Sequence, residues 1–226
     1  TQIHSATEYK TAVHVIQSGM IGKVKEVHAW SNKKWGDLEP LPERTDPVPE
    51  GLNWDQWLGV CEPRPYIKGI YHPGNWRKRI DFGTATFGDM GCHIYDPVFA
   101  ALALKSPISV RSEGPAPSKV NWAINAIIHY VFPGTKYTAG KTVNITWYDG
   151  DERPSKDVLS ILGSRSVPGQ GSLFLGTKGA MLLPHVAQPI LIGKDVEGLA
   201  IEKVDGRDHY HEFVDAVLGK TKTSTA

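Results

Sequence analysis

The sequence predicts an α+β fold: an open, mostly antiparallel β-sheet with helices packed on one face. Three observations favour this fold. From residue 107 onward the chain contains short segments rich in β-branched and aromatic residues, which are typical of strands. Gly, Pro, Asp or Lys separate these segments at intervals typical of hairpins. Few helical patterns interrupt the strand segments, which argues against a repeated strand–helix–strand architecture.

The first half of the chain supplies most of the expected helices. Residues 8–18 predict an amphipathic helix with Thr7 as its cap, and residues 23–30 predict a strand with imperfect alternation. Four prolines between residues 37 and 53 predict a semi-rigid loop, because each proline fixes one φ angle. The segment NWDQWLG then predicts a short helix capped by Asn53. Residues 60–85 are irregular but rich in Tyr, Trp, Arg and His, so we expect them to line a site.

The second half supplies the remaining strands and a last helix. Strands are expected in PISVRSEG, NAIIHYVF, KTVNITWYDG, the hairpin GSLFLGTKGAMLL and QPILIG. Residues 208–220 predict a helix that starts at Asp208 and ends at Gly219. One apolar stripe of this helix comprises Tyr210, Phe213, Val214, Val217 and Leu218.

Composition narrows the range of partners. The 226 residues suffice for one large domain, and 25 Lys and Arg against 24 Asp and Glu give a net charge of +1. This balance argues against nucleic acid or a membrane surface and favours small molecules or proteins. Two cysteines are too few for a disulfide framework, which is compatible with a reducing, cytoplasmic compartment. An export leader removed ahead of residue 1 stays open as an alternative.

The segment GDMGCHIYDP carries the densest functional pattern. A helix from residue 88 to about residue 104 would place Asp89 and His93 on one face, where the carboxylate orients the imidazole and stabilises its protonated form. Asp96 lies one turn further on, and Pro97 is expected to kink the helix. Two other interpretations remain open. One is a capping aspartate beside a core histidine, and the other is a metal site that adds His72.

Four segments, taken together and in their order along the chain, resemble the Gfo/Idh/MocA family of glucose-fructose oxidoreductase and inositol dehydrogenase relatives. They are NWDQWLG, YHPGNWRKRIDFGTATF, GDMGCHIYDP and NITWYDG. The resemblance implies a nicotinamide-dependent enzyme with a Rossmann domain followed by an open-sheet domain for substrate and oligomer contacts. This sequence resembles the second domain only, since it contains no G-x-G-x-x-G and lacks the family's E-K-P motif. Residues 1–20 would then be a remnant strand and linking helix of the first domain. Residues 21–226 would be the substrate and oligomerisation domain, clipped at its end.

The resemblance also assigns roles to residues. His93 resembles the family's catalytic base and Asp89 the group that orients substrate or base. Substrate contacts are expected from seven further residues: Trp76, Arg77, Tyr71, His72, Asn75, Asp96 and Tyr148. Tyr148 is the weaker candidate among them, as is its neighbour Asp149. Gln2 and His4 would face the nicotinamide of NAD or NADP, bound mainly by the other domain. No metal is expected.

Three functions remain open at the level of sequence. The first is the substrate-binding and catalytic-base domain of an oxidoreductase acting on a CH–OH group of a sugar or cyclitol, inactive without its nucleotide domain. The second is an NAD-dependent glycosidase that acts by oxidation and elimination and uses the same base. The third is a non-catalytic module that forms homo-oligomers through its sheet face.

Overall fold

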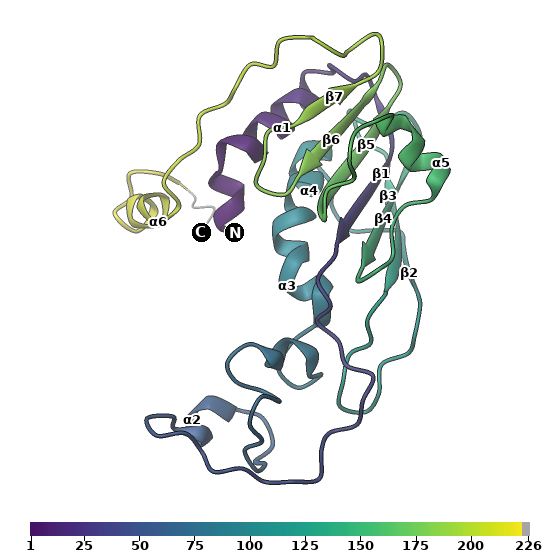
Figure 1. Ribbon diagram of the computed structural model, residues 1–226. Helices are drawn as coiled ribbons and strands as arrows, with labels where there is room; N and C mark the ends of the chain where they lie inside the picture. Colours follow the sequence, from purple (N-terminus) through teal and green to yellow (C-terminus); the bar gives the residue numbers. More distant parts are fainter. Residues whose placement is uncertain (223–226) are drawn as a thin grey trace.

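The computed structural model describes residues 1–222 and is built around one seven-stranded sheet (Figure 1). The strands are β1 (Val24–Ser31), β2 (Ser109–Glu113), β3 (Ile127–Pro133), β4 (Thr142–Asp149), β5 (Gln170–Gly176), β6 (Ala180–Pro184) and β7 (Ile190–Ile192). Their order across the sheet is β2-β3-β4-β1-β5-β6-β7. The neighbouring strands pair antiparallel except β1 and β4, which run parallel. The predicted open, mostly antiparallel sheet is confirmed, and its seven strands are those expected from the sequence.

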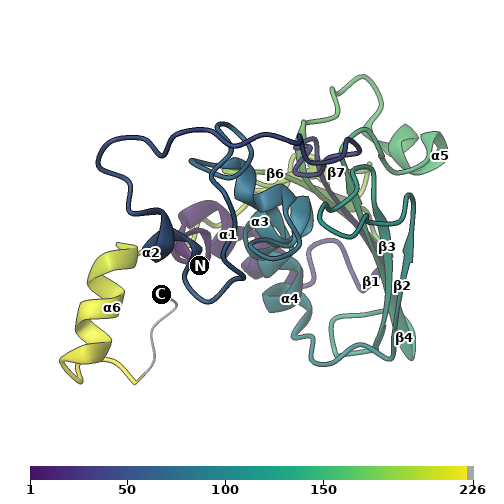
Figure 2. The same ribbon diagram turned by 90° about the horizontal axis from the view of Figure 1, so that it is seen from below.

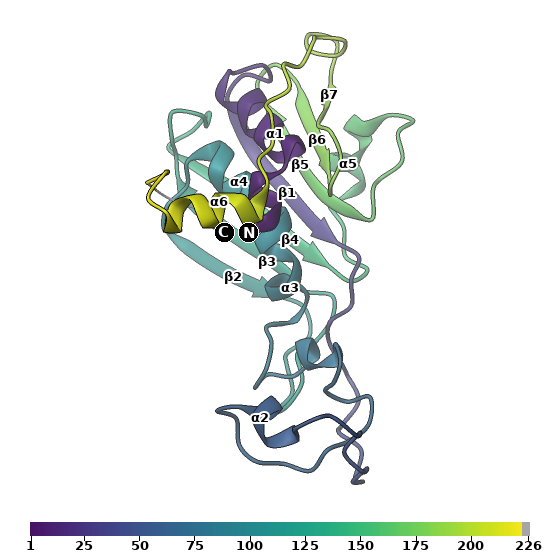
Figure 3. The ribbon, with the colours of Figure 1, turned by 90° about the vertical axis from the view of Figure 1, so that its left-hand side faces the viewer.

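Three helices cover one face of this sheet: α1 (Thr7–Gln17), α3 (Ala85–Ile94) and α4 (Asp96–Leu102), as Figures 1 and 3 show. The opposite face is covered in part by the short α5 (Lys156–Leu159) and the 3-10 turn η3 (Ser160–Leu162), which pack on β1 and β5. The helical cover is therefore mainly, but not wholly, on one face. The remaining elements are α2 (Trp54–Leu58), α6 (His209–Val217), and the 3-10 turns η1 (Gln2–Ser5) and η2 (Asn75–Lys78).

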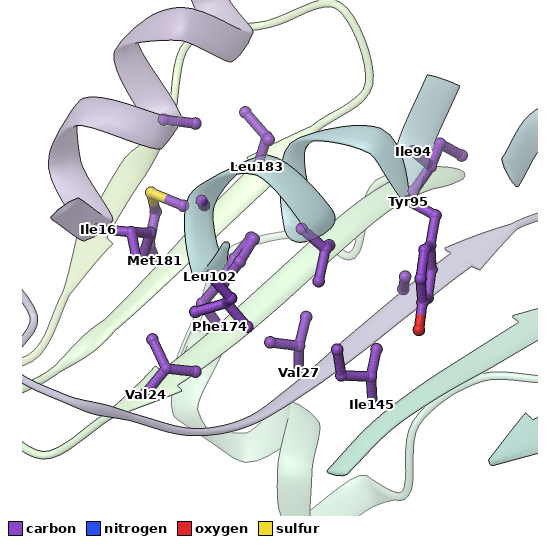
Figure 4. Packing of buried hydrophobic residues seen from close by; sticks show 14 of the residues in the cluster. Ile16, Val24, Val27, Ile94, Tyr95, Leu102, Ile145, Phe174, Met181 and Leu183 are labelled. Atoms are coloured by element: carbon purple, nitrogen blue, oxygen red, sulfur yellow. The ribbon is translucent and has the colours of Figure 1, made fainter. Parts of the chain in front are cut away.

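The main core lies between the helices and the inner face of the sheet. Figure 4 shows Val27, Ile145 and Phe174 on the strands meeting residues of the covering helices such as Ile16 and Leu102. Each of these side chains is almost completely buried, which stabilises the fold by about 1.5–3 kcal/mol per residue. Strand β1 is central and its other face is covered too. Apolar and polar residues alternate only weakly along β1 because both of its faces are buried.

The helix expected from residue 88 to about 104 is in fact two helices. It starts earlier, at Ala85, and breaks at Tyr95 between α3 and α4. Pro97 explains the break, because it has no N–H for the carbonyl of His93 and its fixed φ suits the first turn of a new helix. Tyr95 itself keeps helical dihedral angles, so α4 begins directly where α3 ends.

The N-terminal residues differ from expectation as well. The predicted strand at residues 1–4 is the 3-10 turn η1 instead, whose Ile3 carbonyl accepts from the Ala6 N–H. Thr7 is the first residue of α1 and Ala6 holds the cap position, while the Thr7 hydroxyl accepts from the Gly206 N–H. Helix α1 buries Tyr9 and Val15 in the main core, so the compact body includes residues before 21.

Residues 37–83 form an arm that extends from one end of the sheet (Figures 1 and 3). Its separate core consists of Trp54, Leu58, Tyr66, Ile67 and Tyr71. As predicted, the Asn53 side chain caps α2, accepting from the Gln56 N–H at 3.0 Å. The buried Arg79 fastens the arm to the body through its hydrogen bond with Asn121, and it also donates to Asp37 at the start of the arm.

Helix α6 stands beside the N-terminal end of α1 rather than in the core (Figures 2 and 3). The Arg207 N–H donates to the Ser5 carbonyl at 2.9 Å, and the Ser5 hydroxyl donates to Glu212. The apolar stripe of α6 is therefore exposed, with Tyr210 and Val217 near 70% accessible. Within residues 1–222, no helix has the length and apolar character needed to cross a membrane.

Candidate active site

The carboxylate of Asp89 is the centre of a polar cluster on α3. Its Oδ2 accepts from the indole Nε1 of Trp35 at 2.7 Å and from Lys33 Nζ at 3.3 Å. Its Oδ1 accepts from Arg77 Nε at 2.5 Å. The Asp89 side chain is only 13% accessible, so three donors surround a mostly buried negative charge.

The segment that follows β1 is fixed directly to α3. Thr86, buried on α3, donates its hydroxyl proton to the Lys33 carbonyl at 3.1 Å and accepts from the Trp35 N–H at 2.9 Å. Because β1 is the rigid centre of the sheet, this double contact places Lys33 and Trp35 at a fixed distance from Asp89.

Arg77 reaches Asp89 from the other side, between two indole rings. Its guanidinium carbon lies 4.4 Å from the centre of the Trp76 ring and 5.3 Å from that of Trp35, both within cation–π range. A Cβ at Gly83 would lie 2.7 Å from the Cα of Arg77. A glycine at position 83 therefore allows the main chain to pass close enough to hold Arg77 in place.

These contacts keep Asp89 ionised. Burial raises the pKa of Asp89, but hydrogen bonds and charges from Arg77 and Lys33, with the Trp35 N–H, outweigh burial and hold it below its usual value. The site therefore presents a permanent carboxylate between two cations.

His93 lies one turn further along α3, and within the described chain no hydrogen bond joins it to Asp89. This differs from the expected pair, because the Asp89 oxygens are occupied by Lys33, Trp35 and Arg77. Burial lowers the pKa of His93, and Lys33 lowers it further against the opposing charge of Asp89. The ring is thus neutral near pH 7, which is the form that accepts a proton. Its Nδ1 is buried and has no hydrogen-bond partner in the part of the chain that the structure describes.

Two hollows flank α3. One, of about 460 Å³, is lined by Trp76, Arg77, Gly83, Gly88 and Asp89, among others. The second, of about 580 Å³, lies along the side of α3 that carries Gly91 and Cys92, and it also reaches Gly88. The first hollow joins three of the sequence-predicted site residues, Trp76, Arg77 and Asp89.

The other three residues expected in the substrate wall belong to the arm. Tyr71 is 2% accessible and packs in the arm core. The ring of His72 lies edge-on to Trp57, with ring centres 6.5 Å apart. The Asn75 amide donates to the Gly69 carbonyl at 2.6 Å. The arm core and its turns account for these contacts, and only the neighbouring Trp76 and Arg77 reach Asp89.

Asp96 and the N-terminal pair Gln2 and His4 do not line the hollow beside Asp89, and Asp96 lines the second hollow instead. The Asp96 carboxylate is 2.7 Å from His4 Nδ1, an interaction that joins η1 to the start of α4. Gln2 is exposed on η1.

Tyr148 and Asp149 stand outside the cluster around Asp89, which corrects the grouping expected from the sequence. Tyr148 lies on the outer face of the sheet, where its hydroxyl is 3.0 Å from His28 Nδ1. Alternation along β4 puts it on the face opposite α3. Burial raises the pKa of Asp149, which accepts from the Ala126 N–H at 2.9 Å and thus fixes the start of β3.

Several residues of the site were not anticipated. Lys33 and Trp35 follow directly after the end of β1, and a Lys-Lys-Trp run just past a predicted strand was the available signal. Thr86 carried no signal, because it meets the site only through tertiary packing. Among residues 1–222, no group of three or more His, Cys, Asp or Glu side chains is arranged to hold a metal ion.

Comparison with solved structures shows that other proteins contain a similar fold. A protein from Thermotoga maritima assigned to the oxidoreductases shares 14% identity with a TM-score of 0.54, over 97% of this chain and 52% of that one. A Bordetella bronchiseptica RB50 protein assigned as a dehydrogenase aligns at 12% identity and a TM-score of 0.49, over 98% of this chain and 60% of its own. The chain thus spans little more than half the length of these proteins.

Sequence comparison gives the family. No curated protein sequence matches significantly. The model of the Gfo/Idh/MocA family described as "Oxidoreductase family, C-terminal alpha/beta domain" matches residues 5–166, well over half of the chain. The chain therefore belongs to the Gfo/Idh/MocA oxidoreductase family and contains its C-terminal α/β domain.

Proposed function

We propose that this chain is the substrate-binding and proton-transfer domain of an NAD(P)-dependent oxidoreductase that acts on a CH–OH group of a sugar or cyclitol. One observation carries the proposal: an ionised Asp89, held by Lys33, Trp35 and Arg77, lies one helical turn from a neutral His93. Oriented donors and acceptors beside a neutral imidazole are the parts that alcohol oxidation requires.

The hollow beside Asp89 suits a polyol. Its volume of about 460 Å³ lies in the range of small-molecule sites. The Trp76 ring offers an apolar face for the C–H side of a sugar ring, while Arg77 can donate to its hydroxyl oxygens. Three donors occupy three of the about four acceptor sites of the Asp89 carboxylate, which leaves one site on Oδ1 to accept from a substrate hydroxyl.

In this proposal His93 accepts the proton of the reacting hydroxyl. A lowered pKa keeps the imidazole unprotonated at neutral pH, so that it can act as a base without first losing a proton. A bound nicotinamide would take the hydride from the same carbon.

The residues of this chain can form one wall of a nicotinamide site. The hollow of about 580 Å³ beside α3 is lined by Gly91, Cys92 and Tyr95, among others, and a flat ring would lie along this side of the helix. Gln2 is exposed and can face such a ring, whereas His4 is already engaged by Asp96. The sequence holds no G-x-G-x-x-G to bind the pyrophosphate, so the other domain would supply most of the affinity.

Binding of polyols by the 226-residue chain tests the proposal. We expect inositols or hexoses to shift the NMR signals of the Trp35 and Trp76 indoles. Lys33→Ala should weaken this binding, because Lys33 contacts Asp89. Lys34→Ala is the matched control, since Lys34 pairs with the exposed Asp151. Absence of binding by the whole panel, or equal losses in both variants, would contradict the proposed substrate site.

Calorimetry with NADH tests whether the other domain, rather than this chain, supplies most of the affinity for the cofactor. The chain alone is expected to bind NADH only weakly, because it has no pyrophosphate site. Tight binding by the 226-residue chain would show that its own residues hold the cofactor, contrary to the proposal.

A further inference from the structure

A hollow lined by three lysines lies at the end of the sheet opposite the arm, and it has no part in the function described so far (Figures 1 and 3). Its volume is about 530 Å³. Lys23 comes from the turn between α1 and β1, Lys136 from the turn between β3 and β4, and Lys178 from the turn between β5 and β6. Three separate turns therefore each bring one ammonium group to the same recess.

The length of β1 separates this hollow from the cluster around Asp89. Lys23 directly precedes the first residue of β1, whereas Lys33 follows shortly after its last residue. The eight residues of the strand rise by roughly 26 Å. The hollow is thus a separate place on the molecule and not an extension of the candidate active site.

The lysines of this hollow have no acidic partner. No aspartate or glutamate lines the hollow. Within residues 1–222 the lysines that form ion pairs are Lys33, Lys34 and Lys220, all of them elsewhere. The whole chain has a net charge of only +1, so three unpaired cations around one recess are a local feature. Their mutual repulsion would be relieved by a bound anion.

Backbone hydrogen bonds fix the three turns to one another at the start of β1. The Lys178 N–H donates to the Ile21 carbonyl at 3.0 Å, which joins the β5–β6 turn to the segment before β1. The Val24 N–H donates to the Tyr137 carbonyl at 2.9 Å, which joins the β3–β4 turn to the same segment. The recess therefore has a rigid frame, and only the lysine side chains need to be ordered when a ligand binds.

Lys23 is held between the other two turns. Its N–H donates to Thr177 Oγ1 at 3.0 Å, and its ammonium donates to the Lys136 carbonyl. This contact uses one of three ammonium donors, and the Thr177 hydroxyl still has a proton to donate. Gly22 has a φ of 75°, and a Cβ there would lie 2.2 Å from Thr177 Oγ1. Glycine thus allows the two turns to approach this closely.

The C-terminal end of α1 also reaches the hollow, and free carbonyl groups at a helix C-terminus would repel an anion. Here the turn itself provides donors for them. The Val15 carbonyl accepts from the Met20 N–H at 3.2 Å, and the Ile16 carbonyl accepts from the Gly19 N–H at 3.0 Å. The three ammonium groups therefore determine the sign of the potential in the recess.

We propose that this hollow binds a small organic polyphosphate, a free molecule that carries two or more phosphate groups. Lysine binds phosphate as a point charge, without the planar geometry by which arginine grips one carboxylate. Three cations exceed the charge of about −2 on a single phosphate group and match that of a polyphosphate. Tyr137 adds an aromatic surface beside Lys136, with 5.0 Å between the ring centre and Nζ, for the organic part of the ligand.

The surroundings of the hollow favour a free molecule over the headgroup of a membrane lipid. Protein surfaces that bind membranes combine basic side chains with exposed apolar ones that enter the lipid. Of the large apolar side chains that line this hollow, Ile16 is 1% accessible and Tyr137 is half-buried. Neither projects far enough to enter a bilayer.

Calorimetry of the 226-residue chain with pyrophosphate and with inorganic triphosphate tests the proposal. We expect saturable binding at one site per chain. Changing all three lysines of the hollow to Gln should weaken this binding by about tenfold or more, and Lys178→Gln alone should weaken it several-fold. The control makes the same change of net charge at three exposed lysines outside the hollow: Lys119→Gln, Lys156→Gln and Lys203→Gln.

NMR locates the bound anion. Pyrophosphate should shift the backbone amide signals of Gly22 and Thr177 and leave the indole signal of Trp35, beside Asp89, unchanged. Vesicles of phosphatidylcholine and phosphatidylserine should not retain the chain in sedimentation. Absence of saturable binding, equal losses in the two triple variants, a shift at Trp35 without one at Gly22, or binding to vesicles but not to pyrophosphate would overturn the proposal. No polyol or nicotinamide is present, so its failure leaves the test of the proposed function intact.

Discussion

Asp89 shows how one residue can hold a site together without acting as a base itself. Its carboxylate joins the segment after β1 to η2 through Lys33, Trp35 and Arg77. Without this negative charge the two cations would lie close together in a partly buried place, where their repulsion is only weakly screened. Asp89 therefore stabilises the geometry that a substrate would meet.

Replacing this carboxylate should cost measurable stability. Asp89→Asn keeps the size of the side chain but removes the charge, leaving Lys33 and Arg77 without their counter-ion. We expect the free energy of unfolding in urea to fall by about 1–3 kcal/mol. Asp151→Asn is the control, because Asp151 is 66% accessible and its ion pair with Lys34 should matter by less than about 0.5 kcal/mol. Equal losses in the two variants would show that Asp89 has no special structural role.

At the scale of elements, the position of Arg77 depends on how closely two turns approach. The main chain at Gly83 passes the Arg77 backbone with no room for a side chain, since an added Cβ would lie 2.7 Å from the Arg77 Cα. The Gly83 N–H also donates to the Arg79 carbonyl at 2.9 Å, which links the end of η2 to the segment that leads into α3. The spacing of η2 and α3 is thus set by a backbone contact.

Gly83→Ala should separate η2 from α3. Because the contact is with main chain, the clash cannot be relieved by rotating a side chain, and overpacking of this kind costs about 1–3 kcal/mol. The NMR signal of the Trp35 indole, which donates to Asp89, should move together with that of Trp76. Gly74→Ala is the matched control, since its φ is −125° and its new Cβ would meet only the flexible end of Arg77 at 3.7 Å. Similar spectra for the two variants would contradict this explanation.

The elements also show what the sequence can and cannot predict. The strands and α2 were predicted because turn residues and the Asn53 cap are local signals. The break between α3 and α4 was foreseen only as a kink at Pro97, since how far a helix parts at a proline depends on what packs around it. The stripe on α6 was placed correctly along the helix, yet periodicity does not say whether any surface covers it.

In the candidate site, too, the sequence predicted local features but not those that depend on tertiary packing. Asp89 and His93 could be selected from one short motif, because they are neighbours along a helix. Within residues 1–222 no hydrogen bond joins the two side chains, since Lys33, Trp35 and Arg77 reach Asp89 from distant segments. Tyr148 was assigned to the site from its place after a strand, but strand alternation directs it to the other face of the sheet.

For the whole molecule, the outer face of the sheet is the surface we propose for self-association with a second copy of the chain. Arg111 and Glu113 on the edge strand β2 pair with each other and are exposed, and His129 on β3 lies beside Glu113. A two-fold axis would bring the positive group of one copy to the negative group of the other. Light scattering should show a dimer, and Glu113→Lys should weaken it. A monomer at the highest soluble concentration would contradict the proposal.

The response of the whole fold to acid follows from three partly buried histidines, His28, His93 and His185. Burial is the first cause of a lowered pKa in each. The unfolded chain, with histidine pKa values of about 6.5, then binds protons that the folded chain does not. Stability should be full above about pH 6.5 and should fall as the pH decreases toward the lower folded pKa values. The raised pKa of Asp149 acts in the opposite direction, since its folded form gains a proton first.

Urea unfolding at several pH values between about 7.5 and 5 measures this slope, in a range where most carboxylates stay ionised. His28→Gln should flatten it, because the variant keeps a polar partner for Tyr148 but has no imidazole to protonate. His185→Gln should flatten it as well, and the double variant should have a smaller slope than either single one, since the two side chains lie on opposite faces of the sheet. A slope that is unchanged in the double variant would assign the acid sensitivity to the carboxylates, and the buried histidines would then be titrating as they do in the unfolded chain.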